Sequence, residues 1–551
     1  MHKQKFTLLF DLVIFAASFL LAPQTLLAQA AREPLGLDGA NLVHMAVSAD
    51  AHLTFAGCQG PLGIFYSTDF GGTWNDARDD VYTGGEAKSF AIANNTLFAV
   101  AGFDLYYTSL AGDRPEWSQL EWPDGVEFEA AVLAAAGNFV VMGQGWLPKL
   151  RVYNAATEDL GPEVQIPDTQ GVSSIAIDAP NGYVYVLTGS WQATNAEVYR
   201  ADFDTETGAV SNWVKREPGA STGRFWRVFT APNGDVYVYT FTFGEGIFKS
   251  TNFGDSYTRL KDSTAADIDN QVGFMQFAGD VGLLGEYYST DGGTTWYFQG
   301  DDFLAPEDRI LGASPIGTAG VLHPADVTQA LMRSDVGVTK TEDLSTQDYP
   351  FWLPASSGLQ GVVVNDMAQL ASDKNVVVLA SDSGVAFTNS FLDDDPNWIF
   401  PLFPLGAGGG STAAVFDPNE DGRFFLGAGD VYEGSVTAAG SSSPISWQMR
   451  DQRDGSEQYR MVMELSVRGT VLAACFASLD GAVDGALQFY DIANGSFTET
   501  DTFLDGRPVN TFVAVNQNLF FAGLGVWSPI TGSLNGDNRG VWQSTNGGQS
   551  W

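Results

Sequence analysis

A short polar pattern recurs four times in this chain and constrains its fold more than any other feature. The copies occupy residues 67–74, 250–257, 289–296 and 544–551, and each runs from an apolar segment through a turn to an aromatic residue. A hairpin that recurs along a long chain indicates a repeat architecture. The shared positions are Ser67, Asp69, Gly71 and Trp74; Ser250, Asn252, Gly254 and Tyr257; Ser289, Asp291, Gly293 and Trp296; Ser544, Asn546, Gly548 and Trp551.

Each position of the pattern has a use within a turn. An Asp or Asn side-chain oxygen can accept hydrogen bonds from nearby backbone N–H groups, and Gly supplies backbone angles closed to residues with a Cβ. The aromatic residue that ends the pattern offers a large face for packing against a neighbouring layer. We therefore interpret the Asp and Asn residues as turn formers rather than as metal ligands or catalytic groups.

Weaker versions of the pattern fill the intervals between the four copies. Together they define eleven units that begin near residues 67, 108, 154, 199, 250, 289, 341, 388, 432, 489 and 544. The mean spacing of about 48 residues suits a four-stranded propeller blade. Short runs rich in β-branched and aromatic residues, such as 184–187 and 236–239, lie between these turns. The sequence therefore predicts an all-β chain of β-propeller blades, each with four antiparallel strands, in about eleven repeat units.

The pattern resembles the Asp-box, or BNR repeat, of sialidases, sortilin-type receptors, photosystem II assembly factors and two-propeller xyloglucanases. In those families the motif joins the third and fourth strands of a blade, on the side away from the ligand site. Residues 67–74 and 289–296 carry the full Ser-x-Asp-x-Gly-x-Thr-Trp, whereas the other two copies replace Asp by Asn and Thr by Ser. The resemblance implies the propeller fold but no single function, because the families that share the motif bind or cleave unrelated molecules.

Eleven blades exceed the four to eight of a typical propeller. We favour a first propeller of about seven blades in residues 31–358 and an incomplete second propeller in 359–551 over one unusually wide ring. The stretches 312–324 and 356–358 are the candidate seams. Because Trp551 should open an outer strand and residues 31–41 make a poor strand to close a ring, we expect the sequence to be a fragment.

The first thirty residues have the pattern of a signal peptide. Lys3 and Lys5 precede an apolar stretch, and Ala28-Gln29-Ala30 offers a cleavage site. The predicted location is therefore secreted or at the cell surface, without a membrane span after cleavage. A net charge of −39 repels nucleic acid and anionic membranes. The expected partner is a carbohydrate or an extracellular protein.

Few residues point to a reaction centre. Arg309-Ile310-Leu311 lacks the Arg-Ile-Pro motif of sialidases. Residues 333–337 are similar to the segment that bears a catalytic Asp in the xyloglucanase-like family, so the resemblance implies Asp335 as a candidate catalytic residue. Glycoside cleavage needs two carboxyl groups, and no partner for Asp335 can be named. Residues 381–384 repeat the local pattern in the next unit, which favours a structural role.

No metal site or cofactor is predicted. Residues 417–422 match the first half of a calcium-binding loop, but Ala428 stands where a bidentate Glu is needed, so a hairpin turn is favoured. Cys58 and Cys475 lie in apolar segments and are interpreted as buried free thiols. Three histidines follow the leader and show no metal-ligand spacing: His44, His52 and His323.

These features predict a secreted propeller that acts as a glycan- or protein-binding or scaffold module. The alternative is a polysaccharide-active glycoside hydrolase of the two-propeller xyloglucanase-like type. Trp146, Trp191 and Trp226 lie in Gly-rich or loop-like contexts where a sugar could stack, although packing between blades is the favoured interpretation. Two carboxylates about 5–10 Å apart at a channel mouth would distinguish the hydrolase from the binding module.

Overall fold

A computed structural model describes residues 39–551 of the chain apart from a set of gaps. All described strands belong to one compact unit, Gly36–Trp551. The predicted signal peptide and Asp335 lie outside the described residues. The positions not described are 1–38, 60–62, 103, 123–127, 190–195, 217, 219–224, 241–245, 269–271, 299–314, 335–336, 345–351, 382–383, 394–395, 399–410, 429–430, 437–444, 450–459, 479–484, 499–506, 508, 517 and 529–532.

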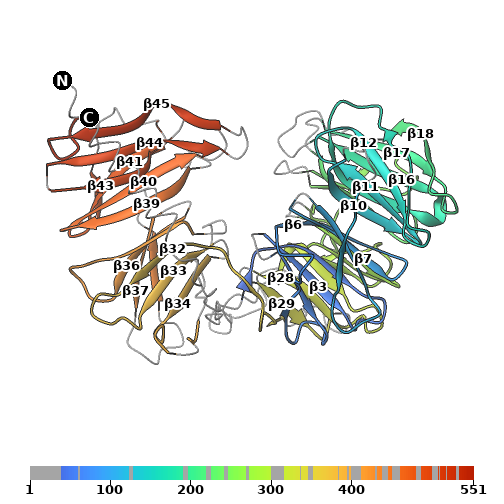
Figure 1. Cartoon of the computed structure of the whole chain (residues 1–551), viewed down its shortest axis with the longest axis horizontal. Coiled ribbons are helices and arrows are strands. Elements are labelled where there is room, and N and C mark those ends of the chain that lie inside the picture. The colour runs from blue at the N-terminus through green and yellow to red at the C-terminus, as the bar shows by residue number, and fades with distance from the viewer. Residues whose placement is uncertain are drawn as a thin grey trace, which may run out of the picture. The chain divides into compact units, whose positions relative to one another are not determined.

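The described chain is built from β-strands, with one short 3-10 helix, η1 (Ala179–Asn181). The strands form eleven antiparallel sheets in which consecutive strands lie side by side, and we number these sheets blade 1 to blade 11 (Figure 1). The predicted all-β propeller fold is confirmed. No helix in the described part of the chain is long and apolar enough to cross a membrane.

The first four blades extend from Leu42 to Lys215. Blade 1 comprises β2 (Leu42–Val47), β3 (Thr54–Cys58), β4 (Ile64–Ser67) and β5 (Asn75–Asp76), and blade 2 comprises β6 (Ala87–Ala93), β7 (Thr96–Ala101), β8 (Asp104–Ser109) and β9 (Trp117–Gln119). Blade 3 comprises β10 (Ala130–Ala136), β11 (Phe139–Gln144), β12 (Lys149–Asn154), β13 (Asp159–Leu160) and β14 (Val164–Gln165). Blade 4 comprises β15 (Val172–Asp178), β16 (Tyr183–Thr188), β17 (Glu197–Phe203) and β18 (Val210–Lys215).

Three further blades extend from Phe225 to Pro354. Blade 5 comprises β19 (Phe225–Thr230), β20 (Val236–Thr240), β21 (Ile247–Ser250) and β22 (Thr258–Arg259). Blade 6 comprises β23 (Met275–Ala278), β24 (Val281–Leu284), β25 (Tyr287–Ser289) and β26 (Tyr297–Phe298). Blade 7 comprises β27 (Pro315–Leu322), β28 (Ala330–Ser334), β29 (Val338–Thr341) and β30 (Leu353–Pro354).

The remaining four blades extend from Val364 to Ser544. Blade 8 comprises β32 (Val364–Gln369), β33 (Val377–Ser381) and β34 (Gly384–Thr388), and blade 9 comprises β35 (Ala413–Phe416), β36 (Arg423–Gly427), β37 (Val431–Val436) and β38 (Ile445–Met449). Blade 10 comprises β39 (Arg460–Arg468), β40 (Val471–Ser478), β41 (Gly485–Asp491) and β42 (Ser496–Thr498). Blade 11 comprises β43 (Val509–Ala514), β44 (Phe520–Ser528) and β45 (Ser533–Ser544).

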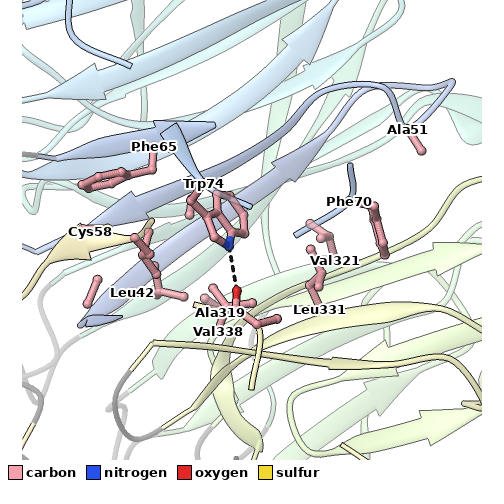
Figure 2. Packing of buried hydrophobic residues seen from close by; sticks show 14 residues of the cluster. Leu42, Ala51, Cys58, Phe65, Phe70, Trp74, Ala319, Val321, Leu331 and Val338 are labelled. Atoms are coloured by element: carbon pink, nitrogen blue, oxygen red, sulfur yellow. Dashed lines mark hydrogen bonds between the residues drawn. The ribbon is translucent and has the colours of Figure 1, made fainter. Parts of the chain in front are cut away.

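Blades 1 to 7 form a closed circle of shared hydrophobic cores. Each blade shares a cluster of buried side chains with the next one, and a further cluster joins blade 7 to blade 1. In that cluster Trp74 of blade 1 packs with Val321 and Leu331 of blade 7, and Trp74 Nε1 donates a 2.7 Å hydrogen bond to Ala355 O (Figure 2). The circle is therefore closed by contacts between blades 7 and 1, because each blade is made from one continuous stretch of chain.

Blades 8 to 11 share cores in the same way. Among the described residues, no cluster joins blade 11 back to blade 8. Cys58 and Cys475 are buried thiols in two different clusters. In the described part of the chain the cores of these four blades form an open row, whereas the cores of the first seven form a closed circle.

A short parallel strand pair joins the segment before blade 1 to the segment after blade 7. Strand β1 (Gly39–Ala40) pairs with β31 (Gln360–Gly361), and Gly39 N–H donates to Leu359 O. The described part of 31–41 makes this two-residue strand pairing, and Asn41 forms hydrogen bonds with Gln59. The interpretation of 312–324 as a seam was wrong, because β27 occupies this stretch as the first strand of blade 7. The other candidate seam, 356–358, lies against blade 1, where Ser357 O accepts a hydrogen bond from Trp74 N–H.

The first strand of most blades carries a β-bulge near its beginning. In β2, β6, β10, β15 and β19 the register shifts by one residue, which leaves one extra residue on the first strand. The residue after the bulge often reaches the first strand of the next blade and supplies an acceptor for a backbone N–H group. Four such hydrogen bonds are Leu133 N to Ser89 Oγ (2.9 Å), Val228 N to Ser174 Oγ (3.1 Å), Ala414 N to Asp366 Oδ2 (2.9 Å) and Phe512 N to Glu464 Oε2 (3.0 Å).

Candidate functional site

The connections between strands lie at two opposite ends of each blade, because consecutive strands are antiparallel. One end, which we call the turn face, carries the connections from the first to the second strand and from the third to the fourth. The other end, the loop face, carries the connections from the second to the third strand and from each blade to the next. The four polar turns lie on the turn face, after β4, β21, β25 and β45.

The four turns share one hydrogen-bond arrangement. In the first copy Ser67 Oγ donates to Asp69 Oδ1 (2.7 Å) and accepts from Gly71 N–H (2.8 Å), while Asp69 Oδ1 accepts from Thr73 N–H (2.8 Å). The same three bonds occur in the other copies, with distances between 2.8 and 3.0 Å. The polar atoms of these residues are thus engaged within the turn itself.

The Asp and Asn copies differ in one further contact. Asp69 Oδ2 accepts a hydrogen bond from Thr73 Oγ1 (3.0 Å), whereas Asn252 Nδ2 donates to Ser256 Oγ (2.9 Å) and Asn546 Nδ2 donates to Ser550 Oγ (2.8 Å). Burial raises the pKa of Asp69, but hydrogen bonds from Thr73 and Ser67 outweigh it and hold this pKa below its usual value. The contact between the third and seventh positions is therefore kept while the direction of donation reverses.

The glycine at the fifth position of each turn presses against the preceding blade. A Cβ on Gly71 would lie 2.8 Å from Leu331 of blade 7, and one on Gly293 would lie 2.8 Å from the hydroxyl of Tyr237 in blade 5. A Cβ on Gly548 would lie 2.8 Å from Phe489 of blade 10. The turns therefore fix neighbouring blades to each other, and this use explains their residues without a ligand.

A different set of residues lies at the loop-face end of the first and second strands of the first circle. The first strands adjoin one another there, so that β2 contacts both β6 and β27. We define the axis cluster as His44, Lys88, Arg227 and Arg333, which come from blades 1, 2, 5 and 7 and are all half-buried. His44 and Arg227 directly follow a bulge, and Lys88 is the extra residue of another.

Hydrogen bonds to the backbone of a neighbouring blade hold the two arginine side chains. Arg333 Nη1 donates to Leu42 O (3.5 Å), two residues before His44, and Arg227 Nη1 donates to Ser173 O (3.4 Å) on blade 4. The ring of His44 lies 6.2 Å from that of Phe90 on blade 2. Lys88 and Arg227 were not predicted as site residues, because the bulges beside them have no signature in the sequence. Arg333 was named only as part of the segment 333–337.

The electrostatics of the axis cluster are strongly perturbed. Burial, and then the positive charge of Arg227, lower the pKa of His44 to about 3, against a slight rise from a hydrogen bond with the backbone of Lys88. Burial lowers the pKa of Arg227 to about 10. At neutral pH His44 is therefore a neutral imidazole next to a charged guanidinium. A site of this kind presents positive charge and hydrogen-bonding groups in a chain that is acidic elsewhere.

Trp146 lies on the loop face, in the connection between the second and third strands of blade 3. Its side chain is 79% exposed, and that of the adjacent Leu147 is 43% exposed. Packing between blades, the interpretation favoured from the sequence, was therefore wrong for Trp146. Trp191 and the side chain of Trp226 lie outside the described residues.

The remaining candidate residues have structural partners. Asp417 Oδ2 accepts from Arg423 Nε (2.8 Å) and Asp417 Oδ1 from Asn419 N–H (2.8 Å), so the calcium-like stretch is a hairpin turn. His323 Nδ1 accepts from the N–H group of Asp326 (2.9 Å). No group of three or more His, Cys, Asp or Glu side chains within the described ranges could hold a metal ion.

His52 joins two blades on the turn face. Its Nδ1 lies 2.6 Å from Asp50 Oδ1, and its Nε2 lies 3.0 Å from Gly112 O in the next blade. The hydrogen bond with Asp50 raises the pKa of His52, although burial opposes it. Ser48 also donates to Asp50 (2.8 Å), but a catalytic Ser-His-Asp arrangement is excluded because Ser48 and Asp50 both face the same imidazole nitrogen.

Two hollows lie on the turn face of the later blades. One of about 650 Å³ lies between blades 8 and 9, and its lining includes Gln369, Phe416 and Asp421. Another of about 560 Å³ lies between blades 10 and 11 against Phe489 and Phe520. Both are formed where two blades diverge, and neither includes a residue of the axis cluster.

Comparisons with solved structures find propellers at very low sequence identity. The crystal structure of the GH74 enzyme of Niastella koreensis has a TM-score of 0.48 at 12% identity, with 94% of this chain and 93% of that chain covered. The GH74 xyloglucanase of Xanthomonas campestris has a TM-score of 0.45 at 14% identity, with 94% of each chain covered. The structure of YCF48 bound to D1 peptide has a TM-score of 0.39 at 12% identity and covers 55% of this chain and 92% of that chain.

No protein-family model and no curated protein matches this sequence. Similarity at the level of these structures assigns no activity to this chain. Its function has to be argued from its own residues.

Proposed function

We propose that this protein is an extracellular binding module that holds a glycan or protein ligand on the loop face of blades 1 to 7. The observation that carries the proposal is the axis cluster, in which charged and hydrogen-bonding side chains come from four blades and the charge of Arg227 acts on His44. Groups with strongly shifted pKa values gather at functional sites more often than elsewhere. The shifts of His44 and Arg227 are of this kind.

The contrast between the two faces supports the choice of the loop face. On the turn face, the polar side chains of the four turns bond within the turn, and the glycines contact the preceding blade. These contacts account for the residues found there. On the loop face, side chains from several blades can contact one ligand together. Binding sites are often built in this way, from loops that a rigid scaffold holds in place.

The extracellular location rests on the leader pattern of residues 1–30. An acidic surface suits this environment because it keeps the exported protein soluble. It also disfavours nucleic acid as a partner.

The proposal is tested by retention of the purified protein, starting at Ala31, on immobilised polysaccharides and on extracellular protein extracts. We expect retention on at least one material, and we expect Arg227→Gln to weaken it by at least about tenfold. The matched control is Arg78→Gln, because Arg78 pairs with Asp76 on the outer strand of blade 1. Urea unfolding of each variant checks that the fold is kept.

Two results would contradict the proposal. Retention that Arg227→Gln leaves unchanged would move the ligand away from the axis cluster. Release of reducing sugars that Asp335→Asn abolishes would instead make the protein a glycoside hydrolase.

A further inference from the structure

Trp146 combines high exposure with a rigidly held backbone. Full burial of a large apolar side chain is worth about 1.5–3 kcal/mol, which the protein forgoes at an indole that is 79% exposed. The backbone on either side is fixed by hydrogen bonds: Lys149 N–H donates to Leu147 O (2.8 Å), and Ile166 N–H donates to Pro148 O (2.8 Å). Gln165 Nε2 also donates to Pro148 O (3.0 Å).

Two glycines pack closely against the same turn and against its neighbours. A Cβ on Gly171 would lie 1.9 Å from Gly145 O and 2.7 Å from Trp146 N, so only glycine fits there. A Cβ on Gly145 would lie 2.9 Å from the Cβ of Ala131, the extra residue of the bulge on β10. The turn therefore lies between Ala131 on the first strand of blade 3 and Gly171, which directly precedes the first strand of blade 4. The backbone of Trp146 is preorganised on the loop face, at the same end of the blades as the axis cluster.

Polar groups lie at the same end of blade 3 as Trp146. Lys149 Nζ and Glu163 Oε1 form a partly exposed ion pair at 2.9 Å, and the half-buried Gln170 directly precedes Gly171. A flat, exposed indole offers an apolar face, and these polar groups at the same end of the blade offer hydrogen-bonding partners. This is the chemistry that recognises a pyranose ring, which has an apolar C–H face and a rim of hydroxyl groups.

A protein partner fits this surface less well. A specific protein interface needs roughly 800 Å² on each side and an apolar centre of several residues. Within the described ranges, the strongly exposed apolar side chains of blade 3 are the adjacent Trp146 and Leu147, and Lys149, which pairs with Glu163, follows two residues later. One ring can stack on such a platform, whereas a protein would have to bury the ion pair.

We propose that Trp146 is a stacking platform for a pyranose ring of a polysaccharide. This inference rests on the proposed function and selects a glycan, rather than a protein, as its ligand. The polysaccharide lies across the loop face of blade 3, at the same end of the blades as the axis cluster. Because the backbone beneath the indole is already ordered, binding costs little conformational entropy at this position.

Affinity electrophoresis and titration of tryptophan fluorescence test the platform. The probes are xyloglucan, β-mannan and laminarin as neutral polymers, and alginate and pectate as polymers with carboxylates. We expect Trp146→Ala to weaken binding of the retained polymer by at least about tenfold, and Trp146→Phe to keep most of it. The fluorescence change on binding should disappear in Trp146→Ala. Phe298→Ala is the control, because Phe298 is exposed on the outer strand of blade 6 and should leave binding unchanged.

The outcomes separate this inference from the proposed function. If Trp146→Ala binds the polymer as the unaltered protein does while Arg227→Gln does not, the platform is refuted and the binding function stands. If no polymer of either kind is retained but an extracellular protein is, the ligand is a protein and the platform is again refuted. If neither is retained, both proposals fail together.

Discussion

At the scale of single residues, the third and seventh positions of the polar turns act as a pair. The carboxylate of Asp69 accepts from the Thr73 hydroxyl, while the amides of Asn252 and Asn546 donate to a Ser hydroxyl. The sequence predicted that these residues form turns from their type alone. It could not predict the reversal of the hydrogen bond, which depends on side-chain positions.

This pairing predicts the effects of substitutions at Asp69. Asp69→Ala removes the acceptor for Thr73 N–H and for its hydroxyl, and should cost about 1–2 kcal/mol of unfolding free energy. The double variant Asp69→Asn, Thr73→Ser rebuilds the arrangement found in residues 250–257 and should cost less than half as much. Urea unfolding at pH 7 measures both values. A double variant as unstable as Asp69→Ala would contradict the pairing.

The pKa values of two histidines should be shifted in opposite directions from the usual value. His44 has a pKa lowered to about 3, so the unfolded chain, with a pKa of about 6.5, takes up a proton that the folded protein does not. Its effect on stability is absent above pH 6.5 and becomes increasingly unfavourable as pH falls toward 3, by at most about 1.4 kcal/mol per pH unit. His52 has a raised pKa, so its stabilisation is complete below pH 6.5 and is lost as pH rises through the folded value.

NMR titration of the imidazole signals measures both values. We expect the His44 signal to stay unchanged from pH 8 to pH 4.5, and the midpoint of His52 to lie above about 6.5. His44→Gln and His52→Gln assign the two signals. A midpoint for His44 between 6 and 7 would show that the centre of the circle is open to water and that Arg227 lies too far away to act on it.

At the scale of strands and turns, the sequence predicted the third strand of each blade best. The recurring turns mark its end, and the units counted from them correspond to the eleven sheets. The bulges on the first strands could not be predicted, because a bulge adds one residue to an otherwise ordinary apolar strand. The axis cluster was missed for this reason: His44 and Arg227 acquire their positions from the bulge that precedes each of them.

The docking of turns on the preceding blade predicts a difference between two glycines. Gly71 and Gly102 both have positive φ, at 80° and 63°, but a Cβ on Gly102 would meet no atom within 4 Å. Gly102→Ala should therefore cost about 1 kcal/mol for its backbone angle alone. Gly71→Ala should cost at least about 1 kcal/mol more, because its methyl group would press on Leu331. Equal urea midpoints for the two variants would contradict the docking.

At the scale of the whole molecule, the division into residues 31–358 and 359–551 stays a proposal. Its physical basis is the closed circle of cores in blades 1 to 7, compared with the open row in blades 8 to 11. Repeat spacing gives the number of blades but not where a circle closes, because closure depends on contacts such as Trp74 with Ala355, 281 positions apart. The function is harder still to predict, since the repeated residues serve the fold.

Expression of fragments tests the division. A fragment of residues 36–362 should fold as a monomer and unfold in one cooperative step. A fragment of residues 36–358 lacks β31 and should be less stable by roughly 1–2 kcal/mol, because the pairing with β1 is lost. Circular dichroism and urea unfolding measure both. If the longer fragment is unfolded while the full chain is folded, the single wide ring becomes the better account.

The pairing of β1 with β31 also bears on whether the seven blades could be inserted into another protein or circularly permuted. Gly39 and Gln360 are register partners, so the chain enters and leaves the seven blades at the same place. A segment whose two ends meet can be inserted into a loop of another protein without stretching its host, and its own ends can be joined and reopened elsewhere. Blades 1 to 7 therefore have the geometry of a unit that can be moved as a whole into another protein. A circular permutant that links Gly39 to Gln360 and opens at the exposed turn around Gly112 should keep the same architecture.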